Sequence, residues 1–478
     1  MKKTIAILIA SAILFPAAAQ YEEQGLIFSQ ALPSMTARSL SMGGAFSSLG
    51  GDLSTAYLNP AGLGMYRKSE ITLSPGIGFI KTKSDYLNEN GEDFRTSFLF
   101  GNAGFVNAFK TKNTKGLTGV SFALAYNRIN DYYRNVTIHG INPSNSLADY
   151  FMEQADGIHP DNLLYEGYYG ERLAFDAYVI DTVPGYPTTY STPVFLPVTQ
   201  NRTIETSGGL NEWSVGFALN FSDIVYFGMG LGIYYLNYNK TMVHSEYDDA
   251  NLSEFNSFNY TETTDQDGMA ANFKCGFIVR PIPILRISGA LHTPLVLNMN
   301  ENYAYYMNAS YNGFIPYVEP IYGEFEYKLV TPLRVLGGLS VQIGKMGLVS
   351  AEIEYVDYSN IRYRNEYDGY DITYINDYIE EDYKPVVNMK AGGEVRFGPF
   401  SVRAGGGYYP NASSTYKMFE QSDYYEFTGG LGFRQKIFYM DMGFSALLHD
   451  ETYTLYYDNV ADIKTNRYRL ITTFGIRF

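Results

Sequence analysis

The feature that most constrains this chain is a long series of alternating segments joined by connections of two lengths. The segments place apolar side chains at every second position, as in Val225, Phe227, Met229, Leu231 and Ile233, where tyrosine or glycine fills the positions between. This period of two is the pattern of a β-strand with one apolar face. Most segments reach the roughly 9–11 residues that a strand needs to cross a bilayer, whereas globular strands peak near 5 or 6.

The order of short and long connections favours a barrel over a soluble sandwich. Connections after even-numbered segments are short, such as 398–399 and 435–436, and those after odd-numbered segments are long, up to 129–210. Short turns at one end and long loops at the other are typical of outer-membrane barrels, and a sandwich gives no reason for them. The sequence therefore predicts an all-β fold, a fourteen-stranded antiparallel transmembrane β-barrel. The predicted strands are 69–81, 95–109, 117–128, 211–221, 225–236, 269–280, 285–297, 325–341, 348–358, 386–397, 400–409, 424–434, 437–448 and 467–478.

Composition excludes several other classes. A disordered chain would lack aromatic residues, which are 16% of this one, with 45 Tyr. One cysteine, Cys275, excludes a disulfide scaffold, and we expect its thiol to be unpaired. The net charge of −15 argues against nucleic acid as a partner.

Both ends of the chain carry features of an exported barrel. Met1-Lys2-Lys3, an apolar run to Phe15 and three alanines before Gln20 form a signal-peptide pattern, so we expect residues 1–19 to be cleaved after Ala19. An uncleaved anchor or a buried first strand is the alternative. The last residue, Phe478, ends an alternating strand and resembles the signal that the barrel-assembly machinery reads. The predicted location is the outer membrane of a Gram-negative bacterium.

Residues 20–68 precede the first strand and do not alternate. A barrel of fourteen strands is too wide for its own wall side chains to fill, since about eight strands is the limit. We therefore expect residues 20–68 to form an N-terminal plug inside the lumen, and residues 69–478 to form the barrel.

The predicted plug resembles the N-terminal hatch of the FadL/TodX family of outer-membrane transport proteins. The resemblance rests on Gly43–Phe46 and on 52–62, in which Asn59, Pro60 and Ala61 match the Asn-Pro-Ala motif of that hatch. Segments 292–294, 331–334 and 354–359 also resemble the family. The resemblance implies passive, non-enzymatic uptake of hydrophobic molecules, such as long-chain fatty acids or aromatic hydrocarbons. It also implies a hatch that shifts and a ligand that leaves through a gap in the wall, for which Pro75 and Pro332 are candidate irregular positions.

We find no pattern typical of catalysis, a metal site or a cofactor: the five histidines lack metal-ligand spacing, and Gly-x-Ser-x-Gly is absent. Among the predicted lumen-facing charges, Lys390 and Arg403 lie mid-strand on neighbouring strands. They are candidates to bind a ligand carboxylate by charge-assisted hydrogen bonds, although paired wall charges are the alternative. Tyrosines near strand ends predict aromatic girdles. They are Tyr234, Tyr235, Tyr238, Tyr355, Tyr358, Tyr408, Tyr409, Tyr424 and Tyr425.

The expected partners are a hydrophobic small molecule and outer-membrane lipid, and we expect a monomer. The connection 129–210 contains a capping-box pattern at Ser146 and a second candidate helix around 163–180. It either packs on the barrel rim or forms an external surface that captures an apolar ligand. Two alternative functions stay open: a structural or binding barrel, such as an adhesin or secretion-machinery subunit, and a haemin-type receptor.

Overall fold

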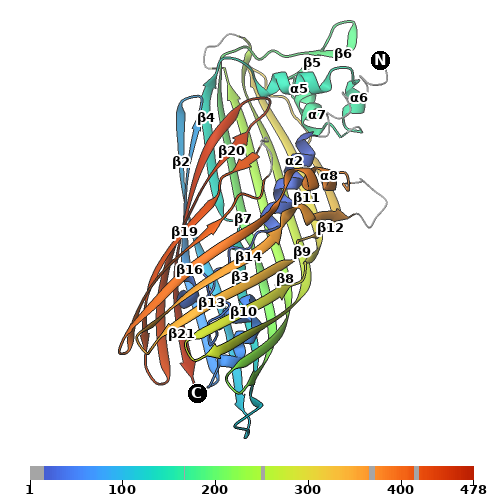
Figure 1. The fold of residues 1–478 in the computed structure, drawn as a ribbon. Helices are drawn as coiled ribbons and strands as arrows, with labels where there is room; N and C mark the ends of the chain where they lie inside the picture. The colour runs from blue at the N-terminus through green and yellow to red at the C-terminus, as the bar shows by residue number, and fades with distance from the viewer. Residues whose placement is uncertain (1–14, 166, 249–252, 365–371, 414–418) are drawn as a thin grey trace.

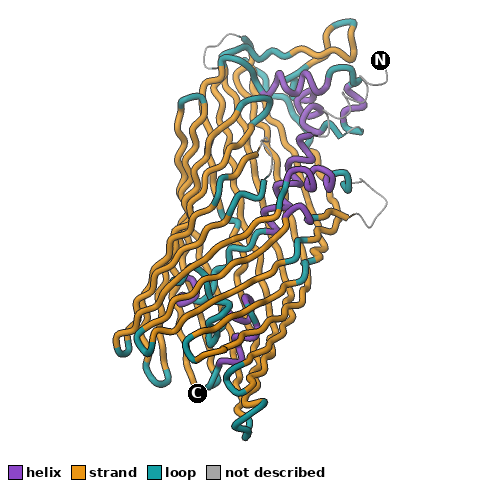
Figure 2. The backbone as a smooth tube through the Cα atoms, viewed as in Figure 1, coloured by secondary structure: helices purple, strands orange, loops and turns teal. Residues whose placement is uncertain are grey.

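The chain folds into one closed, antiparallel barrel of fourteen strands, as predicted (Figures 1 and 2). The computed structural model describes residues 15–165, 167–248, 253–364, 372–413 and 419–478. The first strand pairs with the last, from Glu70 opposite Arg477 to Asp85 opposite Asp462, and this pairing closes the wall. Nine of the strands are continuous: β1 (Glu70–Tyr86), β2 (Glu89–Lys110), β7 (Val198–Phe221), β8 (Val225–Tyr247), β9 (Phe255–Ile282), β16 (Pro385–Phe397), β17 (Phe400–Tyr409), β20 (Phe438–Thr454) and β21 (Val460–Arg477). The other five are interrupted and carry two labels each: β3 (Leu117–Asp131) with β4 (Arg134–Asn142), β10 (Leu285–His292) with β11 (Val296–Tyr311), β12 (Ile321–Val330) with β13 (Arg334–Ile343), β14 (Gly347–Asp357) with β15 (Arg362–Arg364), and β18 (Phe419–Gln421) with β19 (Tyr424–Arg434).

All the predicted short turns lie at one end of the barrel, which we call the short-turn end, together with the C-terminus (Figure 1). The long connections lie at the other end, the long-loop end. The predicted order of connections is therefore confirmed.

Several strands continue well beyond their predicted limits at the long-loop end. The predicted connection 237–268 is largely strand, since β8 runs to Tyr247 and β9 begins at Phe255. Connection 129–210 likewise begins with β4 and ends within β7, so only 143–197 stands outside the wall. The prediction was wrong here because it followed the apolar face, and the outward side chains of these extensions are polar, as at Asp265 and Asp267.

The outer face of the wall is apolar and the inner face is small or polar. In β8, Phe227, Met229 and Leu231 are 40%, 40% and 61% exposed, whereas Gly228 and Gly230 face the lumen and are buried. In a soluble protein the apolar face would point into the core and the polar face toward water. Exposed apolar side chains around a closed wall are the surface that lipid covers. No described helix is long and apolar enough to cross a membrane.

The predicted girdle tyrosines divide between the two faces. Tyr235, Tyr355 and Tyr425 point outward and are 46%, 46% and 49% exposed, together with Trp213 at 57%. They mark the level where the outer face changes from apolar to polar, as expected of an aromatic girdle. Their neighbours point inward, so the girdle prediction is correct for only part of the set. The inward tyrosines are Tyr234, Tyr238, Tyr358, Tyr409 and Tyr424.

Both proline positions singled out in the sequence disturb the wall. The pairing of β1 with β2 shifts register between Ser74 and Pro75. Pro332 lies in the break between β12 and β13, and Pro294 lies in the break between β10 and β11. Because β10 pairs with β13 and β11 with β12, the two breaks lie side by side.

The helices lie in the lumen, in the long connection and beside the wall. The N-terminal part contains α2 (Phe15–Ser29), α3 (Ala37–Leu40), α4 (Thr55–Leu58) and the 3-10 helix η1 (Pro60–Met65). The long connection contains α5 (Leu147–Ala155), α6 (Pro160–Leu163), α7 (Tyr169–Asp176) and the small hairpin β5 (Asp181–Val183) and β6 (Tyr186–Ser191). The 3-10 helix η2 (Tyr358–Asn360) and α8 (Ile375–Asp382) follow β14 and β15. The predicted capping box at Ser146 is present at α5, and residues 1–14 of the predicted signal peptide lie outside the described part of the chain.

Candidate ligand cavity and internal segment

Residues 30–66, which we call the hatch segment, fill the lumen toward the short-turn end (Figure 1). Inward-facing wall residues hold it from several sides. The Ala37 amide donates to Thr473 Oγ1 at 2.7 Å on β21, and Arg286 on β10 donates to the Leu49 carbonyl at 2.8 Å. The amide of Ser47 donates to Glu352 Oε2 at 2.8 Å on β14. Contacts to such separated strands place this segment across the barrel.

The Asn-Pro-Ala motif lies at the base of the hatch segment, against β8 and β9. Asn59 is fully buried, and its Nδ2 donates to the carbonyls of Ser47 at 3.0 Å and Phe277 at 3.2 Å. Its Oδ1 accepts from the Ala61 amide at 3.1 Å, which caps η1, and Pro60 is the first residue of that helix. One side chain therefore joins two parts of the hatch segment to the wall.

Wall glycines let the hatch backbone approach closely. A Cβ at Gly228 would lie under 3.0 Å from the backbone of Pro60 and Ala61, and one at Gly405 would meet the backbone of Met42 in the same way. Because no side chain separates the two backbones at these points, the wall and the hatch segment fit each other specifically.

A buried ion-pair network fixes the opposite side of the hatch segment. Glu394 accepts from hatch residue Arg38 at 2.9 Å and from Arg403 at 2.6 Å, and Arg403 also pairs with Asp441 at 2.7 Å. Each of these side chains is buried, so the network is screened little by solvent.

The two predicted carboxylate-binding residues belong to this surface. Lys390 pairs with Glu352 at 3.3 Å and with Glu354 at 3.6 Å, and Glu352 in turn accepts from hatch amides. Arg403 pairs with Glu394, whose carboxylate also pairs with Arg38 of the hatch segment. The structure thus places both cations beside the hatch segment and outside the cavity described below, and their binding of a ligand stays a prediction.

The long connection covers the lumen at the other end. Apolar side chains of α5–α7, such as Phe151 and Leu173, form one buried cluster with inward-facing residues of the extended strands, such as Ile138, Phe258 and Ile463. The segment therefore packs into the mouth of the barrel, and we call residues 143–197 the cap.

One buried carboxylate fastens the cap to the wall. Glu246 on β8 accepts from the Ser146 hydroxyl and from the Leu147 amide at 2.8 Å, at the N-terminus of α5. It also accepts from Gln200 Nε2 at 2.7 Å and contacts His244 Nε2 at 3.0 Å. A carboxylate at a helix N-terminus is favoured by the helix dipole as well as by these hydrogen bonds.

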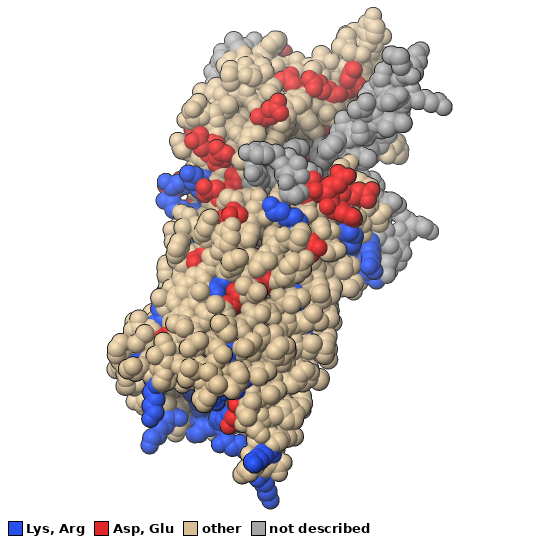
Figure 3. All heavy atoms as spheres, in the orientation of Figure 1, with Lys and Arg blue, Asp and Glu red and all other residues tan. Residues whose placement is uncertain are grey.

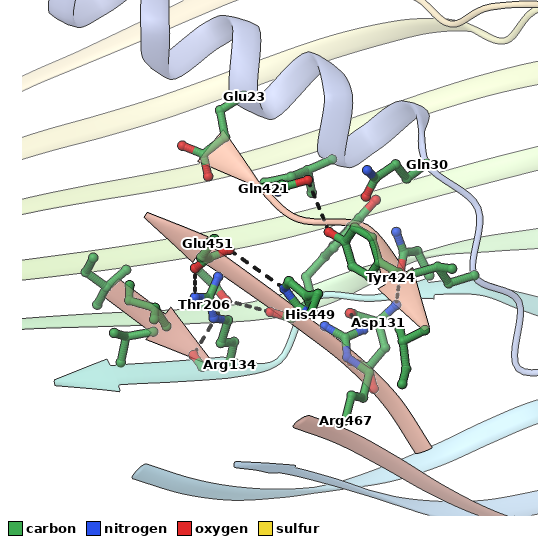
Figure 4. A pocket seen from close by; sticks show the side chains of 18 of the residues that line it. Glu23, Gln30, Asp131, Arg134, Thr206, Gln421, Tyr424, His449, Glu451 and Arg467 are labelled. Atoms are coloured by element: carbon green, nitrogen blue, oxygen red, sulfur yellow. Dashed lines mark hydrogen bonds and ion pairs between the residues drawn. The ribbon is translucent and has the colours of Figure 1, made fainter. Parts of the chain in front are cut away.

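A cavity of about 110 Å³ lies inside the barrel, between α2 and the inner face of the wall (Figure 4). It is lined by Glu23 and Ile27 of α2 and by Gln30, which follows the helix. Most of the remaining lining comes from β3, β4, β7, β8 and β18–β21. Its apolar part is made of Ile27, Leu32, Val136, Ile204, Leu447 and Ile463, and its charged part of Glu23, Asp131, Arg134, Lys240, Glu451 and Arg467.

The charged part of the cavity retains unused hydrogen-bonding capacity. Buried Arg134 Nε, Arg467 Nε, His449 Nδ1, Glu451 Oε2 and Tyr132 Oη have no hydrogen-bond partner among the described residues. Arg134 is nevertheless paired with Glu451, and Arg467 donates to the Asp131 carbonyl at 2.7 Å. Buried polar groups are rarely left unsatisfied, so the cavity is suited to a guest that brings polar atoms to this end, whether water or a ligand.

Most of the charged cavity residues were not predicted because they lie on the strand extensions. Lys240, His449 and Glu451 are in predicted connections, and Arg134 follows the predicted end of the third strand. The signal available in the sequence was the period of two, continued beyond the last outward apolar residue.

A second cavity of about 20 Å³, room for about one water molecule, lies at the two adjacent wall breaks. Phe28 and Tyr57 line it from inside, and His292, Leu295 and Pro332 from the wall. The imidazole Nε2 of His292 is 3.1 Å from the Leu58 carbonyl, which joins the break to the hatch segment.

Solved structures with the same fold agree with this architecture. A Pseudomonas aeruginosa FadL homologue matches with TM-score 0.56 and 12% identity over 94% of this chain and 99% of its own. The Pseudomonas putida toluene transporter TodX matches with TM-score 0.54 and 10% identity over 94% and 99%. The Ralstonia pickettii toluene transporter TbuX matches with TM-score 0.50 and 14% identity over 93% and 98%.

Neither a family model nor a curated protein matches the sequence. The shared feature is the fold: a closed fourteen-stranded antiparallel β-barrel, similar to those of the solved FadL homologue and TodX.

Proposed function

We propose that this protein is an outer-membrane channel for the passive uptake of small hydrophobic molecules that carry one polar end. The observation that supports this most is the cavity between α2 and the wall, which combines apolar side chains with buried polar atoms that lack a partner. The barrel exterior suits a bilayer, and proteins of the same fold are transporters of toluene. No catalytic role is proposed.

The size of the cavity limits the ligand. A cavity of about 150 Å³ is known to hold benzene. At about 110 Å³, this one fits a small ring or the end of an alkyl chain in the conformation described. A single aromatic ring or a short acid is thus favoured, and a long-chain fatty acid requires α2 or the cap to move. The same comparison disfavours a haemin-type receptor, because a porphyrin is several rings across.

A purely structural or adhesive barrel is the second candidate. It predicts a cap that docks a protein and an interior without a pocket. The described interior has a pocket that contacts the N-terminal segment through Glu23, Ile27 and Leu32, which favours transport.

The proposal is tested by filling the cavity. Ile204→Trp places a large ring inside, whereas Leu231→Trp places the same ring on the lipid face, where the native side chain is 61% exposed. We expect the first variant to lose binding of a fluorescent short-chain acid or a single-ring aromatic probe at least tenfold, and the second to bind normally. Equal binding by both folded variants would overturn the proposed site.

We further propose that a ligand leaves sideways through the adjacent wall breaks at 293–295 and 331–333. The strands are interrupted there, two prolines lack an amide donor, and the second cavity lies directly inside. Replacing Pro294 and Pro332 together with valine restores two amide donors. Slower uptake into proteoliposomes with unchanged probe binding supports this route, and unchanged uptake contradicts it.

A further inference from the structure

The short-turn end of the barrel is strongly basic, although the chain as a whole is acidic. Lysine and arginine total 35 against 50 acidic residues. Seven exposed cations nevertheless gather at the short turns and beside the start of β1, and we call them the basic rim. They are Arg67, Lys68, Lys110, Lys112, Lys115, Lys345 and Lys436.

Few negative charges oppose the basic rim. Among the described residues of the short turns and 66–69, Asp223 is the exposed carboxylate side chain, and it already pairs with Arg67 at 2.6 Å. The acidic residues that lie nearby in the lumen, such as Glu70, Glu394 and Asp441, are buried and hydrogen-bonded to arginines. The space-filling view shows this separation, with blue side chains at the lower end and most red ones toward the upper end (Figure 3).

Large apolar side chains stand next to the rim cations. Phe109 precedes Lys110 and is 56% exposed, Met346 follows Lys345 at 67%, and Ile437 follows Lys436 at 60%. An apolar side chain beside a long cationic one is suited to the boundary of a bilayer, where the first enters the hydrocarbon and the second reaches the headgroups.

We propose that the basic rim binds the headgroups of anionic phospholipids in the leaflet that meets the short turns. The cations come from four separate places on the barrel circumference, before β1, after β2, after β13 and after β19. A ring of lipids contacts all of these at once, whereas a compact acidic protein would cover one side. Lysine or arginine near an anionic bilayer surface contributes about 1 kcal/mol each, so the rim as a whole binds strongly.

The partner follows from charge and position. A phosphodiester headgroup supplies the negative charge, and its acyl chains supply contact for the neighbouring apolar residues. Zwitterionic lipid offers the same hydrocarbon without net charge, which gives the experiment its internal comparison.

The test uses the full-length protein in mixed micelles, with phosphatidylglycerol and phosphatidylcholine as probes. The rim variant is Lys110→Gln, Lys345→Gln and Lys436→Gln, and the matched control is Lys81→Gln, Lys83→Gln and Lys464→Gln at the long-loop end. Native mass spectrometry counts the bound lipids, and thermal unfolding reports the stabilisation that they give. Neither triple includes a residue of the cavity.

We expect the wild type and the control triple to prefer phosphatidylglycerol over phosphatidylcholine. In the rim triple this preference should be at least tenfold weaker. Raising the salt concentration should reduce the preference of the wild type in the same direction. Equal retention of the two lipids by the wild type, or an unchanged preference in the rim triple, would overturn the proposal. So would stronger competition by soluble polyglutamate than by phosphatidylglycerol, since that outcome indicates an acidic protein partner.

Discussion

The two halves of the lumen are closed by different kinds of contact. Toward the short-turn end, the hatch segment meets the wall through backbone-to-backbone approaches at glycines and through buried ion pairs. Toward the long-loop end, the cap meets the wall through one large apolar cluster that is fastened by Glu246.

This difference has a physical consequence. Ion pairs and close backbone contacts depend on exact geometry, so a small displacement removes most of their stabilisation. Apolar packing is non-directional and tolerates sliding. We therefore infer that the hatch segment is held in one position, and that the cap and α2 are the parts with freedom to admit a ligand. The predictions below test this contrast, from the largest expected effect to the smallest.

Arg403→Gln should release the hatch segment on its ion-paired side. The substitution leaves Glu394 and Asp441 short of a partner in a buried site, and breaking such a pair costs about 3–5 kcal/mol. Limited proteolysis should then cut within residues 30–66. Arg362→Gln, which breaks an exposed pair with Glu380, should change the free energy of unfolding by less than about 1 kcal/mol. If Arg403→Gln instead weakens ligand binding while the hatch segment stays protected, the predicted carboxylate role is the correct one.

Gly228→Ala should push the hatch backbone away from β8. The new methyl group would lie under 3.0 Å from backbone atoms of Pro60 and Ala61, and overpacking of this kind costs about 1–3 kcal/mol. Gly429→Ala is the matched control, because its nearest neighbour would be the Arg403 carbonyl at 3.8 Å. Denaturant unfolding of the two variants compares them directly. Equal stability would show that the hatch segment can move, against the contrast drawn above.

The cap should become less stable as the pH rises, because of Glu171 on α7. Burial raises the pKa of this carboxyl from 4.5 to about 7. The folded cap therefore binds a proton more tightly than the unfolded one, and stability is lost between about pH 4.5 and pH 7.

Glu171→Gln should remove that pH dependence and stabilise the cap at pH 8 by at most about 3 kcal/mol, at about 1.4 kcal/mol for each unit of pKa. Hydrogen exchange of residues 143–197 at pH 5 and pH 8 measures the effect, with the exposed Asp156→Asn as control. Protection that does not change with pH in the wild type would contradict this prediction.

Asn59→Ala should loosen the base of the hatch segment. It leaves the carbonyls of Ser47 and Phe277 and the amide of Ala61 without this partner, at a cost of about 1–3 kcal/mol. Leakage of a small solute from proteoliposomes reports the loosening. Replacing Asn300, which lies on the outer face of β11, should leave leakage unchanged. Equal leakage from both variants would show that Asn59 has no special role in closing the barrel.

The sequence alone was sufficient to predict the strands of the wall, but not the residues that line the cavity. The number and order of strands could be predicted because each membrane-spanning strand repeats the same local rule, apolar outward and small inward, as in 225–236. Between the aromatic girdle and the long-loop end that rule no longer applies, so the strand extensions that carry Lys240 and Glu451 were predicted to be loops.

The inward charges were predictable in part. Lys390 and Arg403 were correctly placed facing inward, and Glu352 and Glu394 lie directly opposite them on the neighbouring strands, a pairing that the register of short hairpins fixes. Asp441 on β20 and Arg38 of the hatch segment come from elsewhere in the chain, and no local spacing encodes their positions. The Asn-Pro-Ala motif was the exception, because Asn59 and Ala61 interact within three residues of one another.

The central claim is that a hydrophobic molecule occupies the cavity between α2 and the barrel wall. The most direct measurement is organic extraction of the purified protein followed by mass spectrometry, for the wild type, Ile204→Trp and Leu231→Trp. We predict that the wild type and Leu231→Trp yield the same small apolar compound in near-stoichiometric amount, and that Ile204→Trp does not. Identical extracts from all three proteins, after detergent and bulk lipid are subtracted, would contradict the claim.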